Sequence, residues 1–316
     1  MIGHNGNIKT LIICALTLSI FSACAEPFSL LTDEILVPLQ VNLTYDSSNV
    51  SQLDEGEIRC VVKAYPAVQE GKEQTFSEEF TFTGDLLDDF DNQLVVGVPE
   101  GDYNIMVWAD LIEDGAGAPF YDVADFGEIR LVGEHRGSTD YRDALCGSAF
   151  VSVSADTTSS AIPVLDIDLQ RPLARYELIA EDFTDFINAN PSADIDDYTA
   201  VIQYVGFMPN AFSMYTDRPV DSATGVSFRS DIAVVSDTEA RIGFDYVFVN
   251  NKESAVTIRV GILDPGGELI SMTAPVKVPL NRGDNTVLRG RYMTKKPSGG
   301  IGVDPDYEGD HNLNLY

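Results

Sequence analysis

Residues 93–110 read QLVVGVPEGDYNIMVWAD and contain two apolar runs on either side of a short turn. The runs Gln93–Val98 and Tyr103–Asp110 are rich in the β-branched and aromatic residues that favour strands. Pro99–Asp102 supplies the proline and glycine of a turn, so the stretch predicts a β-hairpin. The second run is apolar on both faces, which is typical of a central strand in a β-sandwich.

Apolar and polar residues alternate along most of the remaining chain, which is the pattern of strands with one buried face. In Val37–Tyr45, every second residue is Val, Leu or Tyr. Further strands are predicted at 58–64, 80–82, 150–154, 165–169, 175–180, 198–205, 225–229, 241–249, 255–263, 268–272, 276–280 and 286–292, with one short helix at 182–187. Short strands at this spacing, with little helix, predict an all-β protein built of antiparallel, Greek-key β-sandwiches.

A Gln-Arg-Pro sequence at residues 170–172 separates two sets of predicted strands. We therefore predict an N-terminal sandwich domain at 24–170 and a C-terminal sandwich domain at 171–294. Both lengths are within the usual size of a domain. Residues 295–316 are predicted to be a Gly-rich, acidic C-terminal tail.

Cys24 follows the features of a bacterial lipoprotein signal. Lys9 precedes the apolar run Leu11–Phe21, which is shorter than the about 20 residues that a membrane-spanning helix needs. The small residue Ala23 suits a signal peptidase, which predicts a signal peptide at 1–23, cleavage between Ala23 and Cys24, and a lipid on the Cys24 thiol. Two or more acyl chains, palmitate among them, anchor a protein stably to a membrane. A plain secretory signal with a chance cysteine is the alternative.

The 316-residue chain has a formal net charge of -30 and a sequence pI of about 4.1. Such a surface repels phosphate backbones, which excludes nucleic acid as a partner. It also repels anionic lipid headgroups, so we expect membrane attachment through the lipid and not through a basic face. The hydrophobic content of 44% indicates packed cores instead of disorder.

Cys60 and Cys146 are the cysteines that remain after the signal peptide and the lipidated Cys24. In an exported protein they could form a disulfide bond. The alternative is that both are buried free thiols that pack as small hydrophobic side chains. The sequence leaves both alternatives open because it does not fix the separation of the two Cα atoms.

Residues suited to catalysis are scarce. The chain has three histidines and no Gly-x-Ser-x-Gly elbow, His-Glu-x-x-His zinc motif or Gly-rich phosphate loop. His135 lies between Glu134 and Arg136 and is predicted in a solvated loop. We therefore expect no enzyme activity, no catalytic residue, no cofactor and no dedicated metal site.

Two short motifs resemble ligand sites. Asp304–Asp310 resembles the start of a calcium loop, but Leu315 stands where that loop needs a bidentate glutamate, and only a weak calcium site is left open. Arg282–Asp284 spells an integrin-binding tripeptide. It falls where a hairpin needs turn residues, so a turn is the favoured interpretation.

Four stretches together resemble one known family. They are VPEGDY at 98–103 running into VWAD at 107–110, YRDA at 141–144 with Gly147, LQRPLARY at 169–176, and GGIGVD at 299–304 with Asp310. These stretches resemble the Bacteroidales fimbrillin-type lipoproteins, which are subunits and anchors of type V pili. The resemblance implies a lipidated cysteine, two tandem transthyretin-like β-sandwich domains and a place on the outer membrane at the cell surface. It also implies assembly with other fimbrial subunits by β-strand exchange, and adhesion to host or bacterial surface ligands.

Within that family, an arginine- or lysine-specific protease trims the polymerising subunits and removes the first strand with its lipid. This chain has no Lys or Arg from Ala25 to Ile58, and Arg59 lies in a strongly alternating strand. We therefore predict an anchor or accessory pilus subunit that keeps its lipid.

Two other classes of function remain as alternatives. A surface glycan-binding lipoprotein would stack sugars on exposed aromatic side chains, but Trp108, the one tryptophan, is predicted in the core. A secreted hydrolase lacks a recognisable nucleophile, base or metal set.

Overall fold

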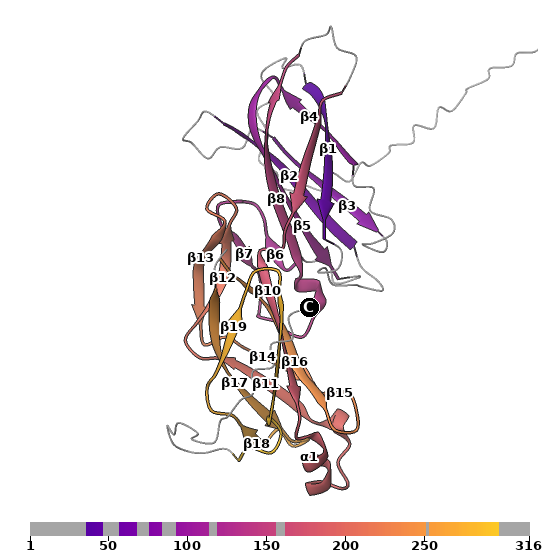
Figure 1. The fold of residues 1–316 in the computed structure, drawn as a ribbon, viewed down its shortest axis with the longest axis vertical. Helices are drawn as coiled ribbons and strands as arrows, with labels where there is room; N and C mark the ends of the chain where they lie inside the picture. Colours follow the sequence, from indigo (N-terminus) through magenta and orange to yellow (C-terminus); the bar gives the residue numbers. More distant parts are fainter. Residues whose placement is uncertain are drawn as a thin grey trace, which may run out of the picture. The chain divides into compact units, whose positions relative to one another are not determined.

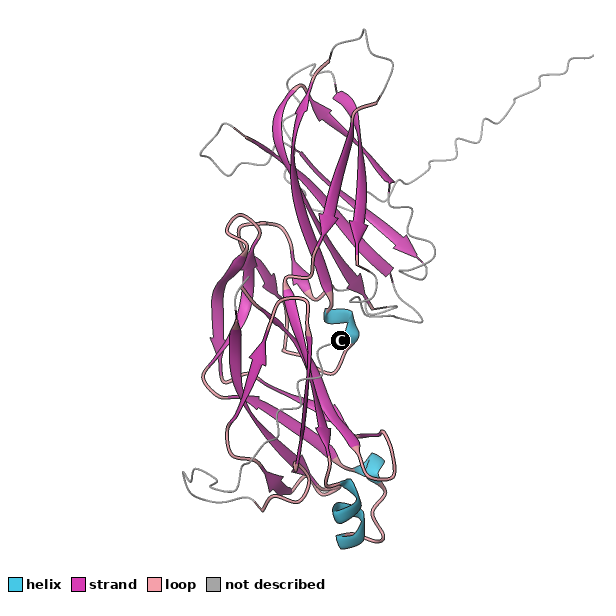
Figure 2. Ribbon diagram, viewed as in Figure 1, coloured by secondary structure: helices cyan, strands magenta, loops and turns pink. Residues whose placement is uncertain are grey.

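The strands predicted from alternation are present, and they are arranged in five sheets in the described part of the chain (Figures 1 and 2). The computed structural model describes residues 36–46, 57–67, 76–83, 93–113, 119–155, 162–250 and 253–296. The predicted signal peptide, Cys24 and the acidic segment 304–310 lie outside these residues. The all-β fold class is confirmed.

The N-terminal sandwich consists of a three-stranded sheet in the order β4-β1-β9 and a four-stranded sheet in the order β3-β2-β5-β8. Its strands are β1 (Leu36–Tyr45), β2 (Glu57–Pro66), β3 (Phe76–Thr83), β4 (Gln93–Pro99), β5 (Gly101–Ile112), β8 (Ala144–Val153) and β9 (Val164–Leu169). Alternate residues of β1, β2, β4, β5, β8 and β9 form one core. The prediction of a hairpin over residues 93–110 is wrong: β4 pairs with β1 in one sheet, and β5 pairs with β2 and β8 in the other, so the turn between them connects the two sheets. A turn signal shows where the chain reverses, but not which strands then pair. The sheets are antiparallel except where β1 and β9 run parallel.

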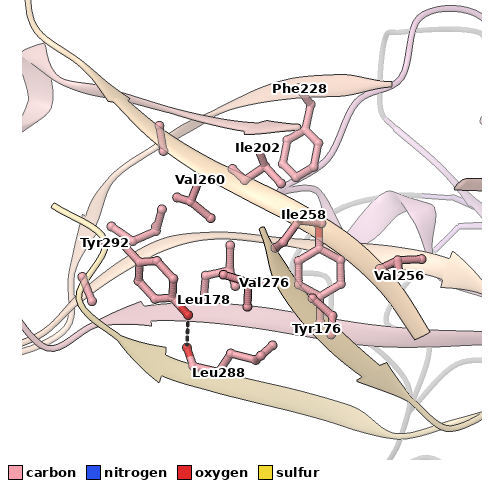
Figure 3. Close-up of a cluster of buried hydrophobic side chains, with 14 of the residues drawn as sticks. Tyr176, Leu178, Ile202, Phe228, Val256, Ile258, Val260, Val276, Leu288 and Tyr292 are labelled. Atoms are coloured by element: carbon pink, nitrogen blue, oxygen red, sulfur yellow. Dashed lines mark hydrogen bonds between the residues drawn. The ribbon is translucent and has the colours of Figure 1, made fainter. Parts of the chain in front are cut away.

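The C-terminal sandwich consists of two sheets, one in the order β15-β16-β10-β20 and the other in the order β14-β11-β17-β18. In the second sheet, β19 also pairs with β17. Its strands are β10 (Leu173–Ala180), β11 (Thr199–Tyr204), β14 (Ser227–Asp231), β15 (Ala233–Val234), β16 (Ala240–Phe248), β17 (Ser254–Leu263), β18 (Leu269–Met272), β19 (Val276–Leu280) and β20 (Asn285–Gly290). Figure 3 shows its core, in which the Tyr292 hydroxyl donates to the Leu288 carbonyl at 3.3 Å. The short helix predicted at 182–187 is α1 (Phe183–Ala189), and the described residues also include 3-10 turns at Asp140–Arg142 and Ile195–Asp197.

A fifth sheet, in the order β13-β12-β7-β6, was not predicted. Its strands are β6 (Tyr121–Asp122), β7 (Ile129–Leu131), β12 (Phe207–Ser213) and β13 (Arg218–Thr224). The two-residue and three-residue strands are too short to show a period, and Pro209 interrupts the pattern of β12. Strand β12 joins β7 through the pairs Ala211 with Arg130 and Phe212 with Ile129.

A third hydrophobic cluster joins Tyr121 and Phe212 of this sheet to Trp108 of β5 and Phe248 of β16. Trp108 has no exposed surface, so its predicted place in a core is confirmed. The cluster takes residues from both sides of Gln170, and residues 35–316 form one unit. The domain limits at 170 and 171 therefore stay a prediction.

Candidate functional site

The first strand, β1, is the central strand of its three-stranded sheet. It pairs antiparallel with β4 from Leu36 opposite Pro99 onward, and parallel with β9 up to Tyr45 opposite Leu169. Its backbone is therefore hydrogen-bonded on both sides, unlike that of an edge strand.

The inward side chains of β1 fix it in the core. Leu39, Val41 and Leu43 have 0% exposed surface. Burying an aliphatic side chain of this size contributes about 1.5–3 kcal/mol, so the three together contribute roughly 5–9 kcal/mol. On the outer face the Asn42 amide donates to Asp166 of β9 at 2.8 Å. Loss of β1 would leave an apolar groove between β4 and β9.

Arg59 is the first basic residue after Cys24, and the fold shields it. Its Nε donates to Asp110 Oδ1 at 2.8 Å and its Nη2 donates to the Tyr121 carbonyl at 2.9 Å. The whole residue is 6% exposed, and its partner Asp110 is 2% exposed. A trypsin-like enzyme cannot reach this arginine in the folded chain, as the sequence predicted.

Cys60 and Cys146 are free and buried, so of the two alternatives the structure has unbridged thiols. Cys60 pairs with Ala109 and Cys146 with Trp108 on opposite edges of β5. Two strand spacings of about 4.8 Å put their Cα atoms beyond the about 7 Å that a disulfide can span. Their side chains also belong to different hydrophobic clusters, on opposite faces of the sheet.

Burial raises the pKa of each cysteine thiol to about 12. At Cys60 the charge of Asp110 contributes to this rise in pKa, whereas at Cys146 the charge of Arg282 partly offsets the effect of burial. Neither thiol forms the thiolate at neutral pH, and the thiolate is the reactive form.

The prediction that His135 lies in a solvated loop is wrong. Its side chain is 12% exposed, and its Nε2 lies 2.7 Å from Asp245 Oδ2 and 3.0 Å from Arg142 Nη1. The ring also packs edge-on against Tyr204, with the ring centroids 5.8 Å apart. The charged neighbours Glu134 and Arg136 suggest an exposed loop, but the tertiary fold packs His135 against Asp245 of β16 and Tyr204 of β11.

Asp245 is the centre of this buried polar cluster. Its side chain has no exposed surface, is in direct contact with Arg142, and accepts hydrogen bonds from the Tyr204 hydroxyl at 2.6 Å and the Tyr246 backbone N–H at 2.8 Å. Burial pushes the pKa of Asp245 upward, but Arg142 and then His135 outweigh it and bring the pKa below its ordinary value. The carboxylate therefore stays charged.

Arg142 and Asp245 are 103 residues apart in the sequence, and sequence analysis missed their pairing. One signal was available: Asp245 stands inside the apolar run of β16, where a charge without a partner is too costly. Four groups contact the Asp245 carboxylate, and the cluster contains no Ser or Cys nucleophile. Its evident role is to hold β16, β11 and the segment before β8 together.

Arg282–Asp284 lies in the turn between β19 and β20, as predicted, but the two strands do not form a hairpin, because β19 pairs with β17 and β20 pairs with β10 in another sheet. Gly283 has a φ of 79°, which favours glycine. Arg282 donates from Nε to the Arg171 carbonyl at 2.9 Å and from Nη1 to Asp217 at 2.5 Å. An arginine held in this way does not present a free guanidinium to a receptor.

Within the described segments, no three His, Cys, Asp or Glu side chains are grouped closely enough to hold a metal ion. None of the helices in those segments has the length and hydropathy to cross a bilayer.

The family model for a family of unknown function, DUF6562, matches residues 34–316. The chain belongs to this family. No curated protein is similar to it in sequence.

Two solved structures illustrate the similarity of fold. The fimbrial anchor protein Mfa2 from Porphyromonas gingivalis is 12% identical, with a TM-score of 0.43 over 75% of this chain and 82% of that one. A fimbrial assembly protein from Parabacteroides distasonis is 12% identical, with a TM-score of 0.39 over 82% and 92%.

Proposed function

We propose that this chain is a lipid-anchored, cell-surface protein of fimbrial type that acts as an anchor or accessory subunit. Surface attachment is supported by the signal features that end at Cys24. The anchor role is supported above all by β1, which is paired on both sides and buries Leu39, Val41 and Leu43. A subunit that keeps β1 cannot accept a strand of another subunit at that place in the sheet.

The absence of cleavage sites supports the same role. No Lys or Arg occurs from Ala25 to Ile58, and Arg59 is buried against Asp110. A protease specific for basic residues therefore has no site between Cys24 and β2 at which to separate the lipid and β1 from the strands that follow. The protein would act by binding and assembly, without catalysis.

Contact with a partner subunit would then use an exposed sheet edge. Strand β20 is the last strand of its sheet, and a groove of about 440 Å³ runs beside it and β19. Leu280 and Val287 supply apolar lining to this groove, and Lys277 and Glu253 supply charges. A strand of another fimbrial subunit could add to this edge through main-chain hydrogen bonds.

Mass spectrometry of the protein extracted from the outer membrane tests the anchor role. We expect a mature chain that starts at acylated Cys24 and includes β1. The Cys24→Ser variant should lose the acyl mass and leave the membrane fraction. A wild-type surface chain that starts beyond Tyr45 would refute the proposal.

An engineered cleavage site tests whether the lack of accessible basic residues protects β1 from a protease. Asn49→Arg introduces a basic residue between β1 and β2, and Asn49→Gln is the matched control without one. Trypsin under native conditions should cut only the Asn49→Arg chain in this region. If trypsin cuts the wild-type chain at Arg59 as fast as it cuts the Asn49→Arg chain at residue 49, then the fold does not shield Arg59.

A photo-cross-linker tests the β20 edge. Asn285 is exposed on β20, whereas Gln203 is exposed on β11, a central strand with neighbours on both sides. A cross-linker at 285 should capture another fimbrial subunit in surface preparations, and one at 203 should not. Equal capture at both positions would argue against pairing at this edge.

A further inference from the structure

The outer face of the sheet β4-β1-β9 carries four exposed aliphatic side chains, which we call the apolar patch. They are Leu36 of β1, Val95 of β4, Val164 of β9 and Ile162 just before β9, and each is between 46% and 58% exposed. Leu36 lies over Gly97 of β4, where an added Cβ would be 3.4 Å from the leucine side chain. Single exposed aliphatic residues are ordinary, but a group of them on one face marks a contact surface.

The register of the strands brings these side chains together. Gln40 of β1 lies opposite Val95 on one side and opposite Val164 on the other, so the two valines flank it on the same face. The Gln40 backbone N–H also donates to the Pro163 carbonyl at 2.9 Å. This bond holds the segment that contains Ile162 beside β1.

The patch occupies only one end of this face. Farther along β1, the Asn42 amide donates to Asp166 at 2.8 Å and the Thr44 hydroxyl donates to Asp168 at 3.3 Å. The strands β1, β4 and β9 contain no Lys or Arg. The face is therefore apolar at the N-terminal end of β1 and polar and acidic at the other end.

The apolar end is the end at which the chain from Cys24 enters the sheet. Residues 25–35 connect Cys24 to Leu36, and a fully extended chain of this length spans at most about 40 Å. A lipid on Cys24 would keep the patch within this distance of the bilayer. A short tether raises the local concentration of a surface, so a small apolar area that could not bind lipid alone can do so next to its anchor.

A second copy of the chain fits this face less well. A stable interface buries about 800 Å² of each partner and involves roughly 20–30 residues a side, whereas the patch has four exposed aliphatic side chains and ends at Asp166. Two copies placed face to face would also bring like charges together, since Asp166 and Asp168 lie on this face and each chain has a net charge of -30.

We propose that the apolar patch rests on the surface of the bilayer in which the Cys24 lipid is inserted. The inference rests on the lipid anchor of the proposed function and adds the face that the protein turns toward the membrane. Apolar side chains of interfacial proteins enter the headgroup boundary to a depth of about 5–10 Å. Leu36 and the two valines lie at this boundary, and Asp166 and Asp168 stay in water.

Photo-cross-linking to lipid tests the patch on phosphatidylcholine vesicles. The full mature chain is coupled through the Cys24 thiol to a maleimide lipid, while Cys60 and Cys146 are buried and do not compete. Benzoylphenylalanine replaces Val95 in one protein and Val234 in the matched control, because both valines are 54% exposed and Val234 lies on β15, outside the patch. Mass spectrometry should find at least about fivefold more lipid adduct at residue 95 than at residue 234.

A charge placed in the patch provides a second test. Val164→Asp should lower the lipid adduct at residue 95 by roughly two- to tenfold, because it removes apolar contact area and adds a charge that resists transfer from water. Val235→Asp is the matched control, since Val235 is 55% exposed and lies outside the patch. Circular dichroism reports folding for each variant.

Three results would overturn the inference: no lipid adduct at residue 95, equal adducts at residues 95 and 234, or capture of a second copy of the chain at residue 95 in place of lipid. An unacylated Cys24 in the native protein would instead refute the lipid anchor of the proposed function. The two failures are distinguishable, because the coupled chain carries its lipid whether or not the cell attaches one.

Discussion

Replacing Asp245 with asparagine should destabilise the protein strongly, because it removes the charge that compensates Arg142. The Arg142 side chain is 1% exposed and the Asp245 side chain is fully buried. An arginine cannot lose its proton in a protein, so the variant keeps an uncompensated charge in the interior. Removing one partner of a buried ion pair costs about 3–5 kcal/mol.

Urea unfolding followed by the fluorescence of Trp108 measures this loss. Trp108 is the only tryptophan, and it lies in the cluster that also contains Phe244 and Tyr246, the neighbours of Asp245. With an m value of about 3 kcal/mol per M, the unfolding midpoint should fall by about 1 M or more.

Two variants check the reasoning. Arg142→Met should cost less than Asp245→Asn, because His135 and Tyr204 still bond the carboxylate that remains. Asp185→Asn breaks an exposed ion pair in which the Asp185 side chain is 58% exposed and the Arg291 side chain 54% exposed. It should leave the unfolding midpoint unchanged. The reasoning is refuted if Asp245→Asn unfolds at the wild-type midpoint with an unchanged m value.

Three further outcomes are expected. Leu43→Ala on β1 should lower the free energy of unfolding by about 2–5 kcal/mol, measured by urea unfolding, whereas the exposed neighbour Thr44→Ala should leave it nearly unchanged. Cys60 and Cys146 should resist a thiol reagent at pH 8 until urea unfolds the chain, because burial raises the pKa of each to about 12; fast labelling of the folded protein would contradict this. Because the folded-state pKa of Asp245 lies below the unfolded value of about 3.9, its stabilisation is present above about pH 4 and is lost as the pH falls through the folded-state pKa. The stability difference between wild type and Asp245→Asn should therefore shrink below about pH 4, and a constant difference would disprove the assignment.

Most of the strands and the all-β fold class follow from local patterns in the sequence. Alternation in Val37–Tyr45 specifies which side chains of β1 face the core, because successive residues of a strand point to opposite faces. The turn at Asp264–Gly267 specifies the hairpin of β17 and β18, and Gly267 has the φ of 82° that glycine accepts. These features depend on residues close together in the chain, so a local pattern reveals them.

The features that depend on residues far apart in the sequence emerge only when the chain is folded. The sheet that joins β7 to β12, and the pairing of Arg142 with Asp245, bring together segments with no local pattern in common. The separation of Cys60 from Cys146 depends on the strand order β2-β5-β8, which alternation does not encode. The burial of His135 also depends on distant residues. Its neighbours in the sequence are charged, but in the folded chain it contacts Asp245, Tyr204 and Arg142, and these contacts bury it.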